Sequence, residues 1–434
     1  MTSAAVSRLV IALAVALAVE PALQAQALPR AEPEEVGLSA QRLERLTSVL
    51  QQYVDDGRLA GGVALVARHG TIAYLEAFGD RDREAGAAMA TDSLFRIASQ
   101  SKALVSTAAL MLQEEGRLVL SDPVSKYLPA FADTTVAVPR EDGGYDVVDA
   151  DRPITLRHLL THTSGIGYGQ GAAADRWEHA GIQGWYFADR DEPIRATVDR
   201  LATLPFDAQP GEDWVYGYSI DVLGAVLEVV TGQTLADVLR QRLFEPLGMT
   251  DTFFYVPPDR AQDLAVVYSA DDEGGIERAP HPGHMIGQGA YVHGPRVSYS
   301  GGAGLVSTAI DYWRFLQMLL DGGTAAGERL LSPKTVELMT TSHIGDLVTG
   351  PGVGFGLGFS VVTDVGARGL PGSPGEYGWG GAYHSTYWVD PVEHLVVVYL
   401  TQLIPAGDLD DHRKLRALVY AAIEESDLAL ARPR

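Results

Sequence analysis

The 434-residue chain contains no cysteine and is poor in positive charge. The absence of cysteine excludes disulfides, thiolate metal ligands and a thiol nucleophile. A covalent nucleophile would therefore have to be a serine, a threonine, a lysine or a carboxylate. With 33 lysines and arginines against 56 aspartates and glutamates, the formal net charge is −23. This charge argues against nucleic acid or an anionic membrane as a partner, because both are bound through basic surfaces.

Long hydrophobic runs are also scarce, and the longest lies near the N-terminus. Leu9 to Val19 is apolar, follows Arg8 and precedes Ala25-Gln26-Ala27. This order is typical of a secretory signal peptide, and the run is well short of the ~20 residues that span a bilayer. An uncleaved membrane anchor is the alternative, which the early end of the run disfavours. We expect cleavage near Ala27 and a secreted or periplasmic mature protein without a membrane span.

Apolar runs near both chain ends predict strand hairpins, and each hairpin is accompanied by a helical pattern. Because a hairpin alone cannot bury its apolar face, we expect one antiparallel sheet built from both ends of the chain. The strands are predicted at residues 61–67, 71–78, 379–389 and 395–401, and the helices at 39–57 and 410–424.

The middle of the chain is dominated by helical patterns, such as the apolar stretch 219–230, which ends at Gly232. We predict an α/β protein of the α+β type. An antiparallel sheet flanked by helices (about 28–97 and 300–434) would carry an inserted all-helical region (about 98–299). Two segments interrupt that region: 141–151, a surface loop or small hairpin, and 270–300, which is rich in glycine, proline and histidine. Long loops are often lids or binding loops, so we expect 270–300 to border the cleft.

The sharpest chemical feature is Ser99-Gln100-Ser101-Lys102. The chain has only four lysines, and only Lys102 has a serine three positions before it. Residues at i and i+3 share a helix face, and a serine in the first turn lies among free N–H groups that stabilise an anion. A serine hydroxyl needs a base, and a lysine can serve when its surroundings favour the neutral amine. The alternative is a helix N-cap with a solvent-facing lysine.

Two further segments could complete such a site. Tyr216 lies in a loop before the helix 219–230, where a phenol could relay a proton or simply pack. Gly380 and Gly381 would let a substrate approach a strand edge, and the N–H of Ala382 could join that of Ser99 in an oxyanion hole. A simple strand bend is the alternative.

Two histidines, His158 and His162, stand four residues apart. This spacing resembles that of a metal-binding pair, but a zinc site needs a third protein ligand and none is near in the sequence. We therefore interpret both as structural residues and expect no metal and no cofactor.

The order of a Ser-x-x-Lys, a loop tyrosine and a Trp-Gly-Gly strand resembles the serine β-lactamase and penicillin-binding-protein-like superfamily, in its class C branch. It is most similar to the family VIII carboxylesterases, over nearly the whole mature chain. The resemblance implies that Ser99 is the acyl-enzyme nucleophile, Lys102 its activating partner and Tyr216 the first residue of the Y-x-N box. Trp379-Gly380-Gly381 would take the place of the K-T-G box, with Ala382 as the second oxyanion donor.

Two departures from the family pattern bear on the substrate. Tyr218 stands where the Y-x-N box has asparagine, and Trp379 stands where the K-T-G box has lysine. A charge-assisted bond to a substrate carboxylate contributes roughly 1.5–3 kcal/mol, which tryptophan cannot supply. Both changes favour an uncharged, apolar acyl group, which Tyr218, Trp379, Gly380 and Gly381 are expected to contact. Other aromatic residues of the helical region could line an acyl pocket or belong to the core: Trp177, Trp185 and Tyr186.

We therefore expect a secreted serine hydrolase, a carboxylesterase for short or medium acyl esters, with a small acyl ester or amide as its partner. One alternative is a β-lactamase or D-amino-acid peptidase that uses the same residues. The other is a catalytically silent, cell-wall-binding protein of the same fold. The oligomeric state is left open.

Overall fold

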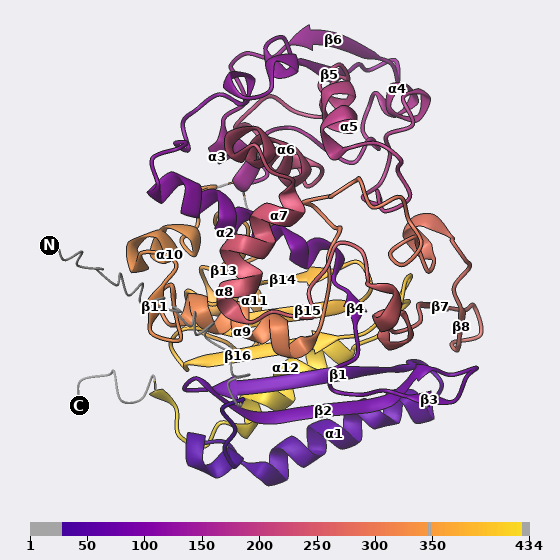
Figure 1. Cartoon of the computed structure of the whole chain (residues 1–434), viewed down its shortest axis with the longest axis vertical. Coiled ribbons are helices and arrows are strands. Elements are labelled where there is room, and N and C mark those ends of the chain that lie inside the picture. Colours follow the sequence, from indigo (N-terminus) through magenta and orange to yellow (C-terminus); the bar gives the residue numbers. More distant parts are fainter. Residues whose placement is uncertain (1–27, 346, 348, 428–434) are drawn as a thin grey trace, which may run out of the picture.

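The computed structural model describes residues 28–345, 347 and 349–427, and the predicted signal peptide 1–27 lies outside them. An eight-stranded antiparallel sheet forms the lower part of the view in Figure 1, in the order β12-β13-β14-β15-β16-β1-β2-β3. The predicted antiparallel sheet flanked by helices is thus confirmed. Its strands are β1 (Gly61–Arg68), β2 (Thr71–Asp82), β3 (Ala87–Ala88), β12 (Val353–Phe355), β13 (Ser360–Val362), β14 (Tyr377–Gly381), β15 (Ser385–Asp390) and β16 (Leu395–Leu400).

The two central strands, β1 and β16, join the two ends of the chain, with Val63 opposite Leu400. Side chains alternate between the faces of a strand, so Val63 and Leu65 enter one apolar cluster while Ala64 and Val66 enter another. Because helices cover both faces, these strands are apolar without interruption. The helices α2 (Ser101–Glu114) and α9 (Ala309–Leu320) contribute to the first cluster, and α1 (Ala40–Asp55) and α12 (Asp411–Ala422) to the second.

The region 98–299 lies mostly above the sheet in Figure 1. Gly232, with a φ of 72°, ends α6 in the left-handed conformation, and Thr234 Oγ1 accepts the Asp237 N–H at 3.1 Å to cap α7. Its helices are α3 (Leu156–Leu160), α4 (Ala174–His179), α5 (Ile194–Leu201), α6 (Ser219–Thr231), α7 (Leu235–Leu239) and α8 (Glu245–Leu247).

This region is not all helical as predicted, although the small hairpin that was one option for 141–151 is present. Two small hairpins interrupt it, β5 (Thr135–Pro139) with β6 (Tyr145–Asp149) and β7 (Tyr268–Ala270) with β8 (Ile276–Arg278). Each closes around a short polar turn containing glycine, a local signal that favours a hairpin over a helix. The remaining elements are β4 (Phe95–Arg96), β9 (Val306–Ser307), β10 (Thr324–Ala325), β11 (Glu328–Arg329), α10 (Pro333–Met339) and α11 (Val365–Arg368).

The prediction of a single strand over residues 379–389 is wrong. The structure divides this segment into β14 and β15, which pair with each other across a turn at 382–384. His384 takes a left-handed φ of 61° in that turn. The turn contains none of the Gly-Pro or Asn-Gly signals that mark hairpins in a sequence, so its position followed from tertiary packing.

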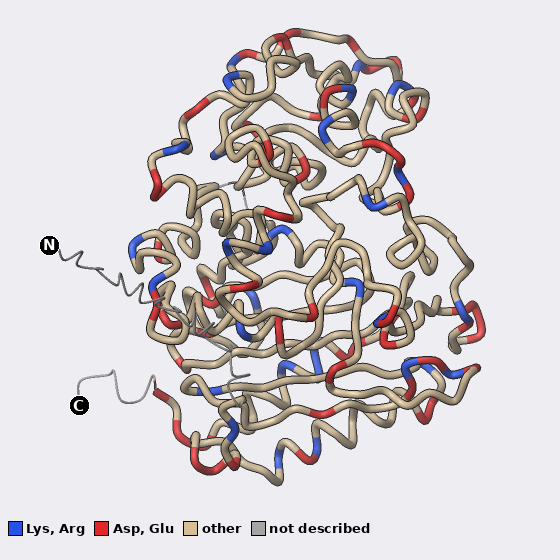
Figure 2. Tube along the Cα trace, viewed as in Figure 1, with Lys and Arg blue, Asp and Glu red and all other residues tan. Residues whose placement is uncertain are grey.

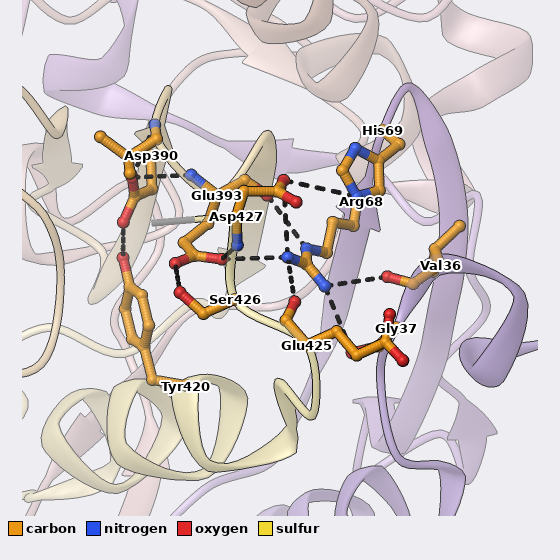
Figure 3. Close-up of polar contacts among 11 residues, drawn as sticks. Val36, Gly37, Arg68, His69, Asp390, Glu393, Tyr420, Glu425, Ser426 and Asp427 are labelled. Carbon is orange, nitrogen blue, oxygen red and sulfur yellow. Dashed lines mark hydrogen bonds and ion pairs between the residues drawn. The ribbon is translucent and has the colours of Figure 1, made fainter. Parts of the chain in front are cut away.

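A buried arginine in the sheet binds segments near both ends of the described chain, as Figure 3 shows. Arg68, at the end of β1, is only 1% exposed. It donates to the Val36 carbonyl at 3.0 Å, to Glu393 Oε2 at 2.9 Å and to the Glu425 carbonyl at 2.7 Å. The N-terminal turn, the β15–β16 turn and the segment after α12 thus share one cation.

Charge is distributed over the whole molecule. Figure 2 shows acidic and basic positions on elements of every region. Among the described residues, no single helix is long and apolar enough to cross a bilayer; only a pair bent by 81°, Ser219–Thr231 with Leu235–Leu247, meets that length and composition together.

Candidate active site

Ser99 lies in a 3₁₀ turn, Ala98–Gln100, that leads directly into α2. The preceding strand β4 pairs with β9, which anchors the approach to this turn. Ala98 has a φ of 43°, a left-handed conformation that a residue with a Cβ rarely adopts and that often marks functional sites. The Ser99 side chain is partly exposed, whereas Gln100 and Ser101 are buried. Of the two serines at this helix start, only Ser99 is therefore accessible to solvent.

Lys102 is 2% exposed, contrary to the alternative of a solvent-facing lysine. Its Nζ lies 3.3 Å from Ser99 Oγ, 3.2 Å from the Tyr168 hydroxyl and 2.7 Å from the Gly302 carbonyl. An ammonium group has three donors, and these three oxygens accept all of them. Loss of one proton would leave a lone pair available to the Ser99 hydroxyl. The predicted pair is thus brought together with the geometry that a base needs.

Tyr216 stands beside this pair. Lys102 Nζ lies 4.6 Å from the centre of the Tyr216 ring, within the range of a cation–π contact. The Tyr216 hydroxyl accepts a hydrogen bond from Trp379 Nε1 at 2.9 Å. The structure therefore brings two residues 163 positions apart into direct contact at the site.

Strand β14 lies beside the turn that holds Ser99. A Cβ added to Gly381 would meet the Ile97 carbonyl at 2.6 Å, so only glycine allows this approach. Ala382, in the turn after β14, packs against a small cluster that contains Ala98. Trp379, Gly380 and Gly381 are half-buried, and so is Ala382. The roles of Ala382 as an oxyanion donor and of Gly380 and Gly381 as substrate contacts remain predictions.

Tyr218 does not reach the open site. It is 0% exposed, its hydroxyl donates to the Gly184 carbonyl, and its ring stacks on Trp177 with centroids 6.0 Å apart. Trp177 is itself buried and donates to the Pro205 carbonyl, so both rings pack in the core. This packing favours a supporting role for Tyr218 behind the site over the predicted substrate contact. The difference arises because α6 begins at Ser219 and turns the Tyr218 side chain inward.

Trp185 and Tyr186, the other two aromatic residues that could line an acyl pocket, differ in their exposure. Trp185 is half-buried and packs against the cluster of Ala98 and Ala382, with its ring edge on Tyr383 at 5.5 Å. Tyr186 is buried and its hydroxyl accepts the Ala290 N–H. Trp185 is therefore the member of the set that adjoins the nucleophile's turn.

Tyr168, whose hydroxyl accepts a hydrogen bond from Lys102 Nζ, was not predicted as a site residue. Burial, followed by the neighbouring Tyr216, raises the pKa of Tyr168 well above 10, so its phenol stays neutral. The ring lies between those of Tyr216 and Tyr218, at 5.7 and 5.0 Å. One local indication of this residue exists in the sequence. In Ile166-Gly167-Tyr168-Gly169 an aromatic side chain stands between two glycines, a pattern typical of a loop.

Of the two histidines that were predicted to be structural, only His162 contacts a residue of the site among the described residues. His158 Nδ1 accepts the Thr155 N–H at 3.2 Å and so takes part in the cap of α3. His162 is 0% exposed, its ring lies 4.7 Å from that of Tyr216, and neither ring nitrogen has a hydrogen-bond partner among the described residues. Burial, and then the charge of Lys102, lower the pKa of His162 well below 6.5, so the imidazole is neutral.

The segment 270–300 packs close to the nucleophile's strand. Arg96, three residues before Ser99, donates from Nε to the Gln288 carbonyl at 2.9 Å. Gly184 approaches Met285 so closely that a Cβ there would lie 2.0 Å from its sulfur. These contacts support the prediction that this loop borders the cleft.

One group of possible metal ligands exists among the described residues: His384, Asp411 and His412. His384 Nε2 lies 2.7 Å from Asp411 Oδ1, and the two imidazoles stack with centroids 4.0 Å apart and planes 19° apart. Because metal–histidine bonds lie in the ring plane, two stacked, nearly parallel rings do not direct their nitrogens at one ion. The group instead hydrogen-bonds the turn after β14 to the start of α12.

The comparisons with known proteins agree with this geometry. The sequence pattern of the family described as Beta-lactamase matches residues 46–421. Esterase EstB of Burkholderia gladioli is 38% identical over 398 residues, which span 87% of this chain and 94% of EstB. Lovastatin esterase of Penicillium rubens is 30% identical over 398 residues, which span 84% of this chain and 94% of the relative.

A solved structure extends the agreement to three dimensions. EstCE1, described as a hydrolase with promiscuous acyltransferase activity, matches with a TM-score of 0.75 at 32% identity, and the match covers 87% of this chain and 98% of EstCE1. The chain therefore belongs to the Beta-lactamase family, and the resemblance predicted from the motifs is confirmed. Within that family it is a serine hydrolase. Its similarity to esterases is consistent with a carboxylic ester hydrolase.

Proposed function

We propose that the chain is a secreted carboxylesterase that hydrolyses short or medium acyl esters through an acyl-enzyme on Ser99. The observation that supports this most directly is the 3.3 Å contact between Lys102 Nζ and Ser99 Oγ. This contact is partly buried, and the rings of Tyr168 and Tyr216 lie beside it. The esterase relatives add to it, since EstB and lovastatin esterase are named for ester hydrolysis.

In the proposed reaction, Ser99 Oγ attacks the ester carbonyl while its proton passes to neutral Lys102. The N–H groups of Ser99 and Ala382 would hold the resulting oxyanion. As the tetrahedral intermediate collapses, the bond to the alkoxy group breaks and that group leaves with a proton relayed through Tyr216. Water then attacks the acyl-enzyme by the same proton route in reverse, which releases the acid and restores Ser99.

The aromatic lining argues for an uncharged acyl group. Trp379 occupies the position of the family's lysine, and its indole N–H is already engaged by Tyr216. A substrate carboxylate would find no matching ammonium there and would lose its hydration without compensation. Phe355, which is buried, and Trp214 pack against Trp379, with ring centroids at 5.4 and 6.3 Å.

A β-lactamase or D-amino-acid peptidase is the second candidate, because it would use the same Ser99, Lys102 and Tyr216. A silent binding protein is a third, but a paired nucleophile and base would then have no purpose. Turnover of p-nitrophenyl butyrate and of nitrocefin by the purified protein separates these functions. Faster hydrolysis of nitrocefin would favour the second candidate, and no acyl-enzyme by mass spectrometry with either compound would favour the third.

The nucleophile is tested by Ser99→Ala. We expect this variant to lose p-nitrophenyl butyrate hydrolysis by roughly 10³-fold or more, because no other group can form the acyl-enzyme. Ser48→Ala is the matched control, since Ser48 is exposed on α1, which packs in the other apolar cluster. Activity that survives Ser99→Ala would refute the assignment.

Secretion is tested separately by expressing the full chain in a bacterial host and sequencing the N-terminus of the exported protein. A mature N-terminus at Leu28 is expected. Retention of the whole protein inside the cell with residues 1–27 attached would contradict it.

A further inference from the structure

Asp221 is a buried carboxylate that the mechanism above does not use. It lies in the first turn of α6 and is 2% exposed. Its Oδ1 accepts the Ser300 hydroxyl at 2.6 Å and the Gly302 N–H at 3.1 Å. A buried carboxylate is costly unless its charge is compensated, so its position calls for a reason.

Gly302 links this carboxylate to the proposed base. Its N–H donates to Asp221, and its carbonyl accepts Lys102 Nζ at 2.7 Å. A Cβ on Gly302 would lie 2.3 Å from Asp221 Oδ2, so glycine is required for this approach. One residue is therefore held at both ends, by an anion on α6 and by a cation on α2.

The charges around this link come from few groups. The titratable residues that face Lys102 are Tyr168, Tyr216, His162 and Asp221, and those that face Asp221 include Tyr168 and Tyr218. Burial raises the pKa values of Tyr168 and Tyr218 and lowers that of His162, which leaves all three neutral near pH 7. Burial also raises the pKa of Asp221, while the Ser300 hydroxyl and the Lys102 charge oppose that shift. Asp221 is thus the carboxylate that faces Lys102 among the described residues.

We propose that Asp221 is a positioning residue: through Gly302 it holds Lys102 Nζ against Ser99 Oγ, and its charge sets the pH range in which Lys102 accepts the serine proton. This inference rests on the proposed function of Ser99 and Lys102. It predicts two separable effects, one on the position of Lys102 and one on its proton affinity.

The test uses a fluorophosphonate probe, which reacts with an activated serine without needing the natural ester. Ser99 Oγ forms a bond to phosphorus, the P–F bond breaks, fluoride leaves and the serine proton passes to Lys102. The rate of adduct formation is followed by intact-protein mass spectrometry between pH 5 and 10. Removal of a nearby anion makes a lysine release its proton at lower pH.

Asp221→Asn keeps an acceptor for the Gly302 N–H but removes the charge. We expect the acidic limb of its pH–rate profile to move down by roughly half a pH unit or more. Asp221→Ala should instead slow the reaction roughly tenfold or more across the range, because Gly302 loses its partner. Should these variants fail to fold, Ser300→Ala removes the 2.6 Å bond to Asp221 and is expected to slow the reaction severalfold.

Asp311→Asn is the matched control. Asp311 is also a buried helix carboxylate; its Oδ2 accepts the Asp251 N–H at 2.7 Å and the Thr252 hydroxyl at 3.1 Å, and it has no bond to Gly302. Its variant should leave the pH profile in place. An unmoved profile in folded Asp221→Asn, or an equal movement in Asp311→Asn, would overturn the proposal.

The wild-type protein separates the two hypotheses. If it reacts with the probe but does not hydrolyse p-nitrophenyl butyrate, the esterase proposal fails while the Asp221 comparison still decides the positioning role. If Ser99 does not react at any pH, the pairing of Ser99 with Lys102 is wrong and both proposals fail.

Discussion

Trp379 shows how one substitution in a family motif changes two properties of a site. In the proposed assignment its indole stands where the family motif has a lysine, so a substrate carboxylate would find no partner there. It also donates to the Tyr216 hydroxyl at 2.9 Å, and this bond orients the phenol next to Lys102. In the proposed mechanism, substrate choice and proton transfer would therefore depend on the same side chain.

We predict that Trp379→Phe lowers kcat for p-nitrophenyl butyrate roughly tenfold and leaves KM within about twofold. The phenyl ring preserves the apolar surface, whereas the Tyr216 hydroxyl loses its donor. Trp388→Phe is the control, because the Trp388 indole has no hydrogen-bond partner among the described residues. A rise in KM with an unchanged kcat would show that Trp379 only binds substrate.

At the scale of elements, the site depends on how closely β14 approaches the turn before α2. The turn carries Ser99, the proposed nucleophile, and the strand leads into Ala382, the proposed second oxyanion donor. Gly381 permits the contact, since a side chain there would collide with the Ile97 carbonyl. Two elements 280 residues apart must therefore be in register to within a fraction of an ångström, because oxyanion donors act only at hydrogen-bond distance.

Gly381→Ala should separate β14 from the turn and lower kcat by about 10²-fold, which is what a displacement near 1 Å can cost. The neighbouring atom belongs to the backbone and cannot simply rotate away. Gly350→Ala, where an added Cβ meets nothing within 4 Å, is the control. Steady-state kinetics, together with a thermal melt of each variant, measure the effect. Full activity of Gly381→Ala would mean that the strand tolerates the shift.

At the scale of the whole molecule, Arg68 connects segments from both ends of the chain (Figure 3). It contacts the turn before α1, the β15–β16 turn and the tail after α12, and its partner Glu393 is also buried. Removal of one member of a buried ion pair leaves the other without compensation.

We predict that Arg68→Met lowers the free energy of unfolding by about 3–5 kcal/mol, measured by urea denaturation. Arg140→Met, which breaks exposed pairs with Asp142 and Asp146, should leave it nearly unchanged. Activity per folded molecule should be the same in both variants, since neither arginine belongs to the site. Equal stability losses would show that the buried arginine is not the stronger link.

Local chemistry in the sequence was enough to predict much of this protein. The spacing of Ser99 and Lys102 places both on one helix face, and continuous apolar runs predict the strands β1 and β16. Gly232 and Thr234 mark a helix end and a helix start through their own backbone and side-chain preferences. The site pair and the individual strands could be predicted because each depends on residues that lie close together in the chain.

Only the tertiary structure decided which distant groups complete the site. Tyr168 and Gly302 bind Lys102 from 66 and 200 positions away, and no local pattern relates them to it. Tyr218 was expected to face the substrate, but the start of α6 turns its ring into the core. In the sequence, Asp221 has the ordinary position of an acidic residue in the first turn of a helix. Only the fold brings Gly302 into contact with it. Helix periodicity is a property of neighbours, whereas these contacts exist only because packing brings separate elements together.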